Sequence, residues 1–311
     1  MLKNTALRGG MLLMALALVL LPGCPPQRRP EVRQNVQGTE PTLSLFIAET
    51  GRRVSIKMEE YLHGVVAAEM EPTWPREALA AQAILARTFT VERIAAGGVR
   101  QSRGTDASTD IKEFQAYNPK RINDNVRQAV AETRGQIVTY NGRPVRAWFH
   151  AYSGGRTASP AEGLDFSGGA TPYLTPVTDR PSEREARWSA QFTSSQVRSA
   201  IRSVTGRDPG AVTRITIERR GPSGRALTLR VNNVSVKATA LRLAIGSTRM
   251  RSTLLDSVST ASGRVAMRGR GYGHGVGLSQ LGALKLAKEG RSAQEIIDFY
   301  FTGVVIEQRW R

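Results

Sequence analysis

The sequence predicts an α+β protein, because helical and hairpin patterns are mixed along the chain without regular alternation. Two hairpin turns stand out, at Asn141-Gly142 and at Ser223-Gly224, each between runs of apolar residues. Several segments place apolar residues at the spacing of one helix face, and no stretch of the chain repeats another. The 311 residues suffice for one large domain or two moderate ones.

The first part of the folded chain is predicted to be a strand followed by two helices. Residues 42–48 alternate apolar and polar side chains as a strand does. Residues 59–70 carry an apolar stripe at helical spacing, and Pro72 ends this helix. Pro75 stands where a first helical turn tolerates proline, so a long helix is expected over 75–96.

The middle of the chain contains less regular structure. Residues 99–123 are polar and irregular, and a short helix is expected over 124–133. Residues 135–152 form the hairpin that turns at Asn141-Gly142. From Trp188 onwards the pattern changes.

The remaining elements are again a mixture of helices and strands. They are a helix over 194–206 capped by serine, a hairpin over 213–231, a short helix over 238–246, a strand over 264–275, a helix over 278–290 and a helix over 292–301. The strand enters a run of glycines.

The amino terminus is predicted to be a secretory signal peptide, residues 1–24. Two basic residues precede an apolar stretch at 11–21, which is too short for a membrane-spanning helix. The stretch ends in LPGC, similar to a bacterial lipobox, so we expect lipidation of Cys24 and export of a membrane-anchored lipoprotein facing the periplasm or the cell wall. Residues 25–41 are rich in proline and polar groups and are expected to form a flexible tether before the folded part, 42–311.

The net charge of +18 favours anionic partners. Export argues against nucleic acid, and an aromatic content of 6% offers little for base stacking, so we expect no nucleic-acid partner. Anionic lipid and the carboxylates and phosphates of a cell wall are the remaining candidates for an anionic partner. Genome composition is the competing explanation of the basic bias.

The stretch GRGYGHGVGLSQLGA, residues 269–283, raises the question of why so much backbone is left without side chains around His274. It fits neither the dinucleotide fingerprint nor the P-loop. If the run is extended, the face opposite His274 carries only glycines, which is typical of a place where a ligand or another backbone comes close. A packed corner with a structural histidine is the alternative.

Glu69 is the candidate general acid. It closes the helix 59–70, where the peptide dipoles leave partial negative charge. Apolar neighbours and Glu71 disfavour its ionised form, so its pKa should rise, which suits acid catalysis. An ordinary exposed glutamate at a helix end is the alternative.

Other chemistries have weaker support. The three histidines lack the spacing of a metal motif, and the only cysteine is Cys24, so no metal is expected. A serine nucleophile at Ser153 would lack the G-x-S-x-G turn. A glycosidase with paired carboxylates would need a second acid near Glu69, for which the candidates are Asp106, Asp110 and Glu113.

Three long stretches, in order, resemble the signatures of the SpoIID/LytB family. They are EYLHGVVAAEMEPTWPREALAAQAILARTFTV, FHAYSGGRT and GRGYGHGVGLSQLGALKLAKEG, and the resemblance extends over roughly 42–307. It implies a catalytic domain of mixed helices and β-hairpins, forming two intertwined subdomains with a substrate cleft between them. Some members carry cysteine ligands for zinc after the FHS-type histidine; here none follows His150, so neither zinc nor another cofactor is expected.

The resemblance implies lytic cleavage of peptidoglycan glycan strands, particularly strands stripped of their stem peptides by an amidase. It assigns the catalytic acid to Glu69, which would act as acid and then as base, giving a 1,6-anhydro sugar without a second carboxylate. The groups expected around the cleft are Gln82, Arg87, Gln115, Tyr117, His150, Ser153, Arg156, Tyr272, His274, Ser279 and Gln280. A buried structural ion pair is an equal possibility for Arg87.

Two rivals to the enzyme remain open. Some relatives are described as amidase enhancers, which bind the wall or an N-acetylmuramoyl-L-alanine amidase and activate it without cutting. A scaffold that binds glycan through its basic surface would lose binding at high salt and be insensitive to Glu69.

Overall fold

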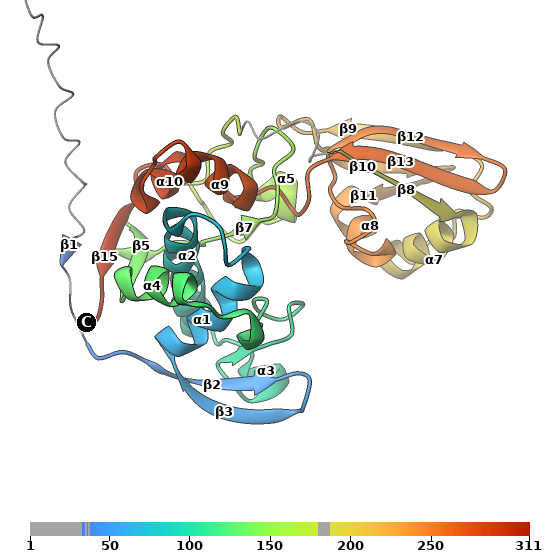
Figure 1. The fold of residues 1–311 in the computed structure, drawn as a ribbon. Helices are drawn as coiled ribbons and strands as arrows, with labels where there is room; N and C mark the ends of the chain where they lie inside the picture. The colour runs from blue at the N-terminus through green and yellow to red at the C-terminus, as the bar shows by residue number, and fades with distance from the viewer. Residues whose placement is uncertain (1–32, 35, 37, 180–186) are drawn as a thin grey trace, which may run out of the picture. The chain divides into compact units, whose positions relative to one another are not determined.

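The computed structural model describes residues 33–34, 36, 38–179 and 187–311 (Figure 1). The predicted signal peptide 1–24, with Cys24, and the first part of the predicted tether lie outside these ranges. No helix within them is both long enough and apolar enough to cross a membrane. Helices and small sheets are mixed along the chain, which confirms the α+β class.

The first hydrophobic core is built around α2 (Arg76–Ala95), whose alanine-rich sequence lets neighbours pack closely on several sides. Figure 1 shows α2 among the helices α1 and α4 and the carboxyl-terminal pair α9 and α10. The bounds are α1 Met58–Glu69, α4 Asp124–Glu132, α9 Gln280–Lys288 and α10 Ala293–Tyr300. A sheet of β5 (Gln136–Tyr140), β6 (Arg143–Pro144) and β15 (Val305–Gln308) joins this core.

A second core lies between Trp188 and Met267. It is formed by two three-stranded antiparallel sheets, in the orders β12-β13-β8 and β11-β10-β9, and by two helices. The bounds are β8 Arg187–Thr193, β9 Ile215–Arg220, β10 Ala226–Val231, β11 Val234–Lys237, β12 Leu255–Ala261, β13 Arg264–Arg270, α7 Ser194–Thr205 and α8 Ala238–Ile245.

Short elements complete the fold. They are β1 Arg33–Gln34, β2 Thr42–Ile47, β3 Arg52–Lys57, α3 Arg100–Arg103, β4 Ala107–Ser108, the 3-10 helix η1 Pro119–Arg121, β7 Phe149–His150, α5 Pro160–Leu164 and β14 Leu278–Ser279. The parallel pair β7 and β14 brings the FHAYSGGRT stretch to the end of the glycine run.

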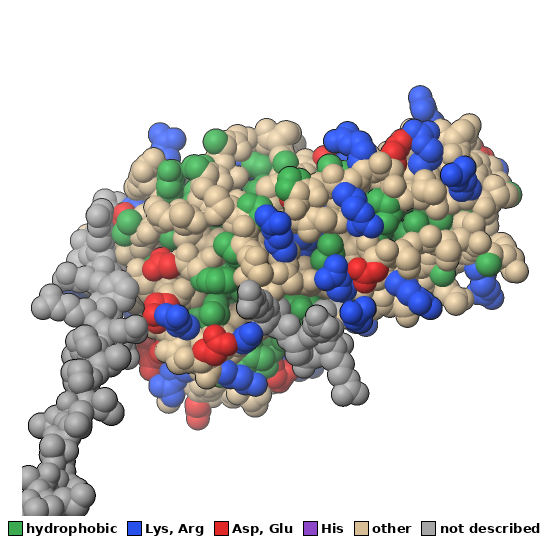
Figure 2. All heavy atoms as spheres, turned by 90° about the horizontal axis from the view of Figure 1, so that it is seen from above, with side chains coloured by type: hydrophobic (Ala, Val, Ile, Leu, Met, Phe, Trp, Pro, Cys, Tyr) green, Lys and Arg blue, Asp and Glu red, His purple; other side chains and the backbone are tan. Residues whose placement is uncertain are grey.

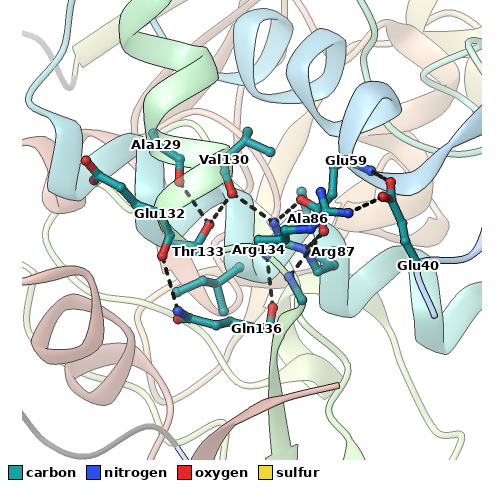
Figure 3. Close-up of polar contacts among 12 residues, drawn as sticks. Glu40, Glu59, Ala86, Arg87, Ala129, Val130, Glu132, Thr133, Arg134 and Gln136 are labelled. Atoms are coloured by element: carbon teal, nitrogen blue, oxygen red, sulfur yellow. Dashed lines mark hydrogen bonds and ion pairs between the residues drawn. The ribbon is translucent and has the colours of Figure 1, made fainter. Parts of the chain in front are cut away.

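An ion-pair cluster fixes the start of α1 against α2 (Figure 3). The Arg87 guanidinium donates from Nε to Oε1 of Glu59 at 3.0 Å and from Nη2 to Oε2 at 2.6 Å. The Glu40 carboxylate accepts the Glu59 N–H at 2.9 Å and pairs with Arg134. Because Glu59 also accepts the Trp310 indole N–H at 2.9 Å, both ends of the folded chain are tied to α1.

Residues that precede position 42, the predicted start of the folded part, also make contacts with the folded chain. β1 pairs in parallel with β15, Glu40 joins the cluster at the start of α1, and the Pro41 carbonyl accepts the Met58 N–H at 3.0 Å. Polar composition alone gave no sign of these contacts, because their partners lie far along the sequence.

Three local predictions are also corrected. The helix cap is Thr193 rather than a serine, with Gln196 completing a capping box. The Asn141-Gly142 hairpin has a short second arm, since β6 ends at Pro144 and β7 pairs with β14 instead. The strand into the glycine run ends at Arg270, and its antiparallel partner β12 was not predicted.

Candidate functional site

The site is built around Glu69, the last residue of α1. Its carboxylate is partly buried, and burial raises its pKa above the ordinary value, as the sequence predicts. No basic residue lies in the last turn of the helix. The predicted contribution of Glu71 is not seen, because its exposed carboxylate pairs with Arg121 at 2.7 Å.

Two neutral donors hold the Glu69 carboxyl group. The Ala116 N–H donates to Oε1 at 3.0 Å, and the Gln280 side-chain amide donates to Oε2 at 3.3 Å. Both hydrogen bonds act against burial by favouring the ionised form, yet the pKa stays raised. The group is thus prepared to hold a proton and to remain hydrogen-bonded after losing it.

Gln82 and Gln280 act together behind Glu69. Both side chains are buried, and the Gln280 amide lies 3.4 Å from Oε1 of Gln82, on α2. Their predicted sugar contacts are therefore replaced by a positioning role: Gln82 orients Gln280, and Gln280 orients the acid.

The segment that carries Ala116 is anchored on both sides. Gln115 is buried and donates to the Thr90 hydroxyl at 3.0 Å, which makes it a structural anchor rather than a sugar contact. The Tyr117 ring stacks on Tyr61, with centroids 5.7 Å apart. A Cβ on Gly64 would lie 2.2 Å from the Tyr117 ring, so the glycine in the α1 sequence makes room for that ring. Tyr117 itself is partly exposed.

The two histidines of the predicted cleft lie next to each other and are neutral. Their ring centroids are 5.5 Å apart. Burial lowers the pKa of His274 to about 3, with Arg242 acting in the same direction. Burial and the neighbouring His274 lower the pKa of His150. His150 is buried, with Nδ1 3.1 Å from the Val276 carbonyl and Nε2 without a hydrogen-bond partner among the described residues, so of the two rings only His274 is partly exposed.

The glycine run is not an extended strand with a bare face. Gly271, Gly273, Gly275 and Gly277 all have positive φ. Their Cβ positions point at protein atoms: a Cβ on Gly277 would lie 2.0 Å from the Trp148 carbonyl oxygen, and the others would meet the backbone at 152–154, the His150 side chain or a guanidinium. Close approach of other parts of the chain to these glycines is therefore confirmed. The expectation of an extended strand with one face free of side chains is wrong.

Ser153 and Ser279 are corrected to structural roles because neither side chain is exposed. The Ser153 hydroxyl donates to the Asp179 carboxylate at 2.6 Å, and the Tyr300 hydroxyl donates to the other oxygen at 3.2 Å. Ser279 caps α9 by accepting the Gly282 N–H at 3.3 Å. Among the other predicted contacts, the side chains of Arg156 and Tyr272 are exposed.

Arg87 belongs to the ion-pair cluster shown in Figure 3 and has no exposed surface. Besides Glu59 it donates to the Gln136 carbonyl at 3.0 Å. This decides between the two predicted roles in favour of the buried structural ion pair.

The candidate second acids are engaged elsewhere. Glu113 pairs with Arg103, and that hydrogen bond lowers its pKa. Burial raises the pKa of Asp106, but hydrogen bonds from Ser44 and the ion pair with Arg100 outweigh it, so the net direction is downwards. These carboxylates remain ionised in their contacts, and Asp110 accepts the Lys112 N–H at 2.9 Å.

Sequence reasoning missed Arg225, which joins the two cores. The side chain is fully buried and donates to the Ser153 carbonyl at 2.6 Å and the Arg156 carbonyl at 2.9 Å. Burial lowers its pKa to about 10. A Cβ on Gly275 would lie 2.2 Å from the guanidinium, so this glycine is required by a residue far away in the sequence. No local pattern predicts such a contact.

The fold and the site define an α+β protein in which the partly buried carboxylate of Glu69 is held by neutral donors. Among the described residues, no group of three or more His, Cys, Asp and Glu side chains is placed to hold a metal ion. The family model described as Stage II sporulation protein (SpoIID) matches residues 49–140, which include Glu69. A domain of unknown function (DUF8618) matches residues 174–277.

Curated relatives extend the match over most of the chain. Stage II sporulation protein D of Bacillus subtilis (strain 168) is 32% identical over 272 residues, covering 82% of this chain and 75% of that protein. The protein of the same name from Bacillus amyloliquefaciens is 32% identical over 298 residues, covering 88% and 83%. The Amidase enhancer of Bacillus subtilis is 27% identical over 295 residues, but the match covers only 40% of that protein. The chain belongs to the SpoIID family.

Proposed function

We propose that this chain is a lytic transglycosylase that cleaves the bond between N-acetylmuramic acid and N-acetylglucosamine in peptidoglycan glycan strands stripped of stem peptides. The observation that carries the proposal is the raised pKa of Glu69 together with its neutral donors. A carboxyl group that is protonated more readily than usual, yet remains hydrogen-bonded as an anion, suits a residue that gives up a proton and takes one back.

The first step is proton donation. Protonated Glu69 gives its proton to the glycosidic oxygen, and the bond between that oxygen and C1 of the muramic residue breaks. The Glu69 carboxylate that remains is stabilised by the Ala116 N–H and the Gln280 amide. The leaving N-acetylglucosamine carries the donated proton as a hydroxyl.

The second step closes a ring within the muramic residue. The C6 hydroxyl oxygen attacks C1, and Glu69 takes the hydroxyl proton, which restores its protonated form. The product is a 1,6-anhydro end, and neither water nor a second carboxylate is consumed. The engagement of Asp106 and Glu113 in ion pairs favours this course over hydrolysis with two carboxylates.

Sugar contacts are assigned to the predicted side chains that retain exposed surface. These are Tyr117, Arg156, Tyr272 and His274. Tyrosine rings offer flat apolar faces with a hydroxyl at the edge, which matches the two faces and the rim of a pyranose. The His274 imidazole is neutral and accepts the Val276 N–H at Nδ1 at 3.0 Å, so its contact with a sugar would be made by the exposed part of the ring.

The placement of the protein in the cell is part of the proposal. Export through the signal peptide 1–24 and lipidation at Cys24 would hold the enzyme at a membrane surface facing the cell wall. An N-acetylmuramoyl-L-alanine amidase acting first would supply the stripped strands.

A non-catalytic role is the second candidate, because one relative carries the name Amidase enhancer. In that case the chain would bind the wall or an amidase, and Glu69 would serve binding alone. The positions of the donors around Glu69 favour the enzyme.

Product analysis tests the proposal. Amidase-stripped glycan strands are incubated with the protein lacking residues 1–24, or with its Glu69→Gln variant, and the new ends are identified by mass spectrometry. We expect 1,6-anhydromuramic ends from the unmodified site and none from the variant. Reducing ends would establish a hydrolase, and stimulation of an amidase without any cleavage would establish the enhancer.

A further inference from the structure

The segment 187–270 carries most of the net positive charge of the chain. It contains 16 Lys and Arg against 3 Asp and Glu, a net +13 of the total +18. Figure 2 shows many Lys and Arg side chains and few acidic ones on the face of the part built from β8 to β13. The three acids pair with neighbouring arginines: Asp208 with Arg198, Glu218 with Arg230 and Asp256 with Arg270. The segment therefore favours anionic partners.

Two arginines of this segment lie beside the glycine run. The Arg251 guanidinium carbon lies 5.5 Å from the centroid of the exposed Tyr272 ring. The Arg251 carbonyl accepts the Gly273 N–H at 2.9 Å and the Arg242 Nε–H at 3.1 Å. The backbone that fixes the glycine run thus also fixes Arg242, which is half-buried, next to the exposed Arg251.

Neither Arg242 nor Arg251 has a carboxylate partner in the part of the chain that the structure describes. Burial lowers the pKa of Arg242, and Tyr272 acts in the opposite direction. The imidazole of His274 is neutral and therefore supplies no negative charge to either arginine. A half-buried cation without an anion costs free energy, which an anionic ligand would offset.

We propose that Arg242 and Arg251, within the basic segment 187–270, bind the carboxylates that an amidase uncovers on the lactyl side chains of N-acetylmuramic acid. The amidase cut converts the lactyl amide into a carboxylate and releases the peptide amine, so each disaccharide of a stripped strand carries one negative charge. An intact strand has an amide at the same position. The pair therefore distinguishes the stripped strand by the group that the amidase creates.

The position of the pair relative to Glu69 fits this role, which rests on the proposed function. Tyr272 lies at one end of the glycine run, and Gln280, which donates to Glu69, follows the other end. Between them the His150 and His274 rings are 5.5 Å apart, and β7 pairs with β14. A strand bound at Tyr272 and cleaved at Glu69 would cross the run. Arg242 and Arg251 both lie in the region 174–277 that matches a domain of unknown function, so the role proposed for this region is carboxylate binding.

Binding to two matched probes tests the proposal. Both use the Glu69→Gln protein, so that strands are not cut. One probe is the amidase-stripped strand, and the other is the same strand with its lactyl carboxylates converted to neutral amides by carbodiimide and ammonia. We expect the Kd to be lower for the carboxylate strand by about tenfold or more, since hydrogen bonds to charged groups are the stronger ones.

Arginine variants locate the preference. Adding Arg242→Gln, or separately Arg251→Gln, removes most of the preference, because it weakens binding of the carboxylate strand much more than binding of the amidated strand. The exposed Arg264, at the opposite end of β13 from the glycine run, provides the control, because Arg264→Gln removes the same charge. Circular dichroism and Tm identify a variant that fails to fold. If the half-buried Arg242→Gln variant fails to fold, the variant of the exposed Arg251 is used for the test.

Four results would overturn the proposal: equal Kd values for the two probes, a preference that survives both arginine variants, an equal loss with Arg264→Gln, or tighter Arg242-dependent binding to anionic phospholipid vesicles than to strands. The assay is independent of cleavage. If the protein with Glu69 forms no anhydro ends but the preference for the carboxylate strand is observed, the proposed enzyme is overturned and this inference is supported.

Discussion

Two glutamates of α1 show how position on one helix separates a structural carboxylate from the proposed catalytic one. Glu59 lies in the first turn, where the helix dipole favours negative charge, and it pairs with the buried guanidinium of Arg87. Glu69 closes the last turn, where the dipole disfavours negative charge, and its donors are neutral. Both side chains are removed from water to a large degree, so the cation makes the difference.

Burial has different consequences for the carboxyl groups of Glu59 and Glu69. Where a cation accompanies the carboxylate, burial produces a rigid charge pair that ties chain segments together, as at Glu59 (Figure 3). At Glu69, whose donors are neutral, burial raises the pKa and leaves a group that can exchange a proton. Variants of these residues and of their hydrogen-bond partners test whether the nearby cation accounts for the difference between Glu59 and Glu69.

The largest effect is expected from Glu69→Gln. Glutamine keeps the shape of the side chain and one of its two accepted hydrogen bonds but carries no transferable proton, so strand cleavage should fall by roughly 10²- to 10⁴-fold while strand binding persists. The rate of anhydro-end formation measures it. Glu71→Gln is the matched control, since Glu71 is exposed and pairs with Arg121; equal losses in the two variants would contradict the assignment.

Arg87→Met should act on stability instead. Removing the cation leaves Glu59 buried without its partner, which costs about 3–5 kcal/mol of unfolding free energy. Urea denaturation checks the loss, and Glu59→Gln should give a loss of similar size. Because the two residues interact directly, the double variant should lose less than the sum of the two single losses. Strict additivity would mean that the pair is not coupled.

Gln280→Leu should give a smaller, pH-dependent change. The lost amide donor favours the ionised form of Glu69, so its removal raises the pKa further and moves the alkaline limb of the cleavage profile to higher pH. Turnover should fall by about tenfold through weaker positioning of the acid. Gln128→Leu, at an exposed position of α4, serves as the control. A profile that does not move would assign Gln280 a packing role only.

The smallest effect concerns stability against pH. The folded-state pKa of Glu69 is raised, so its contribution is fully present below the unfolded pKa and is lost as pH rises through the folded pKa. The unmodified protein should therefore lose stability relative to Glu69→Gln as pH increases over this window. Denaturation midpoints of both proteins between pH 3 and 8 would reveal it, and a constant difference would argue against the raised pKa.

Much of the local structure was predictable because its causes are local. Asn141 and Gly142 both adopt positive φ, 50° and 73°, as the Asn-Gly turn requires. The helix that ends at Glu69 and the direction of its pKa followed from an apolar stripe and a terminal position. The sequence also left the correct alternative open for Arg87.

The unpredicted parts depend on long-range contacts. Glu40 reaches Glu59 and Arg134, and Arg225 reaches the carbonyl of Ser153, across separations that no periodicity reports. The Ala116 donor is a backbone group, so no side-chain type marks it. For the same reason the sequence could not decide whether a ligand or another part of the chain lies beside the glycines of the run, where protein atoms distant in the sequence occupy the space.

The carbon-13 NMR titration of the glutamate side-chain carboxyl carbons tests the central claim most directly. The Glu69 signal is assigned as the one missing from Glu69→Gln, and its midpoint is compared with those of the other glutamates. The account predicts a Glu69 midpoint above the ordinary value of 4.5. A midpoint at or below that value would show that the neutral donors outweigh burial, and the proton-exchanging role of Glu69 would have to be abandoned.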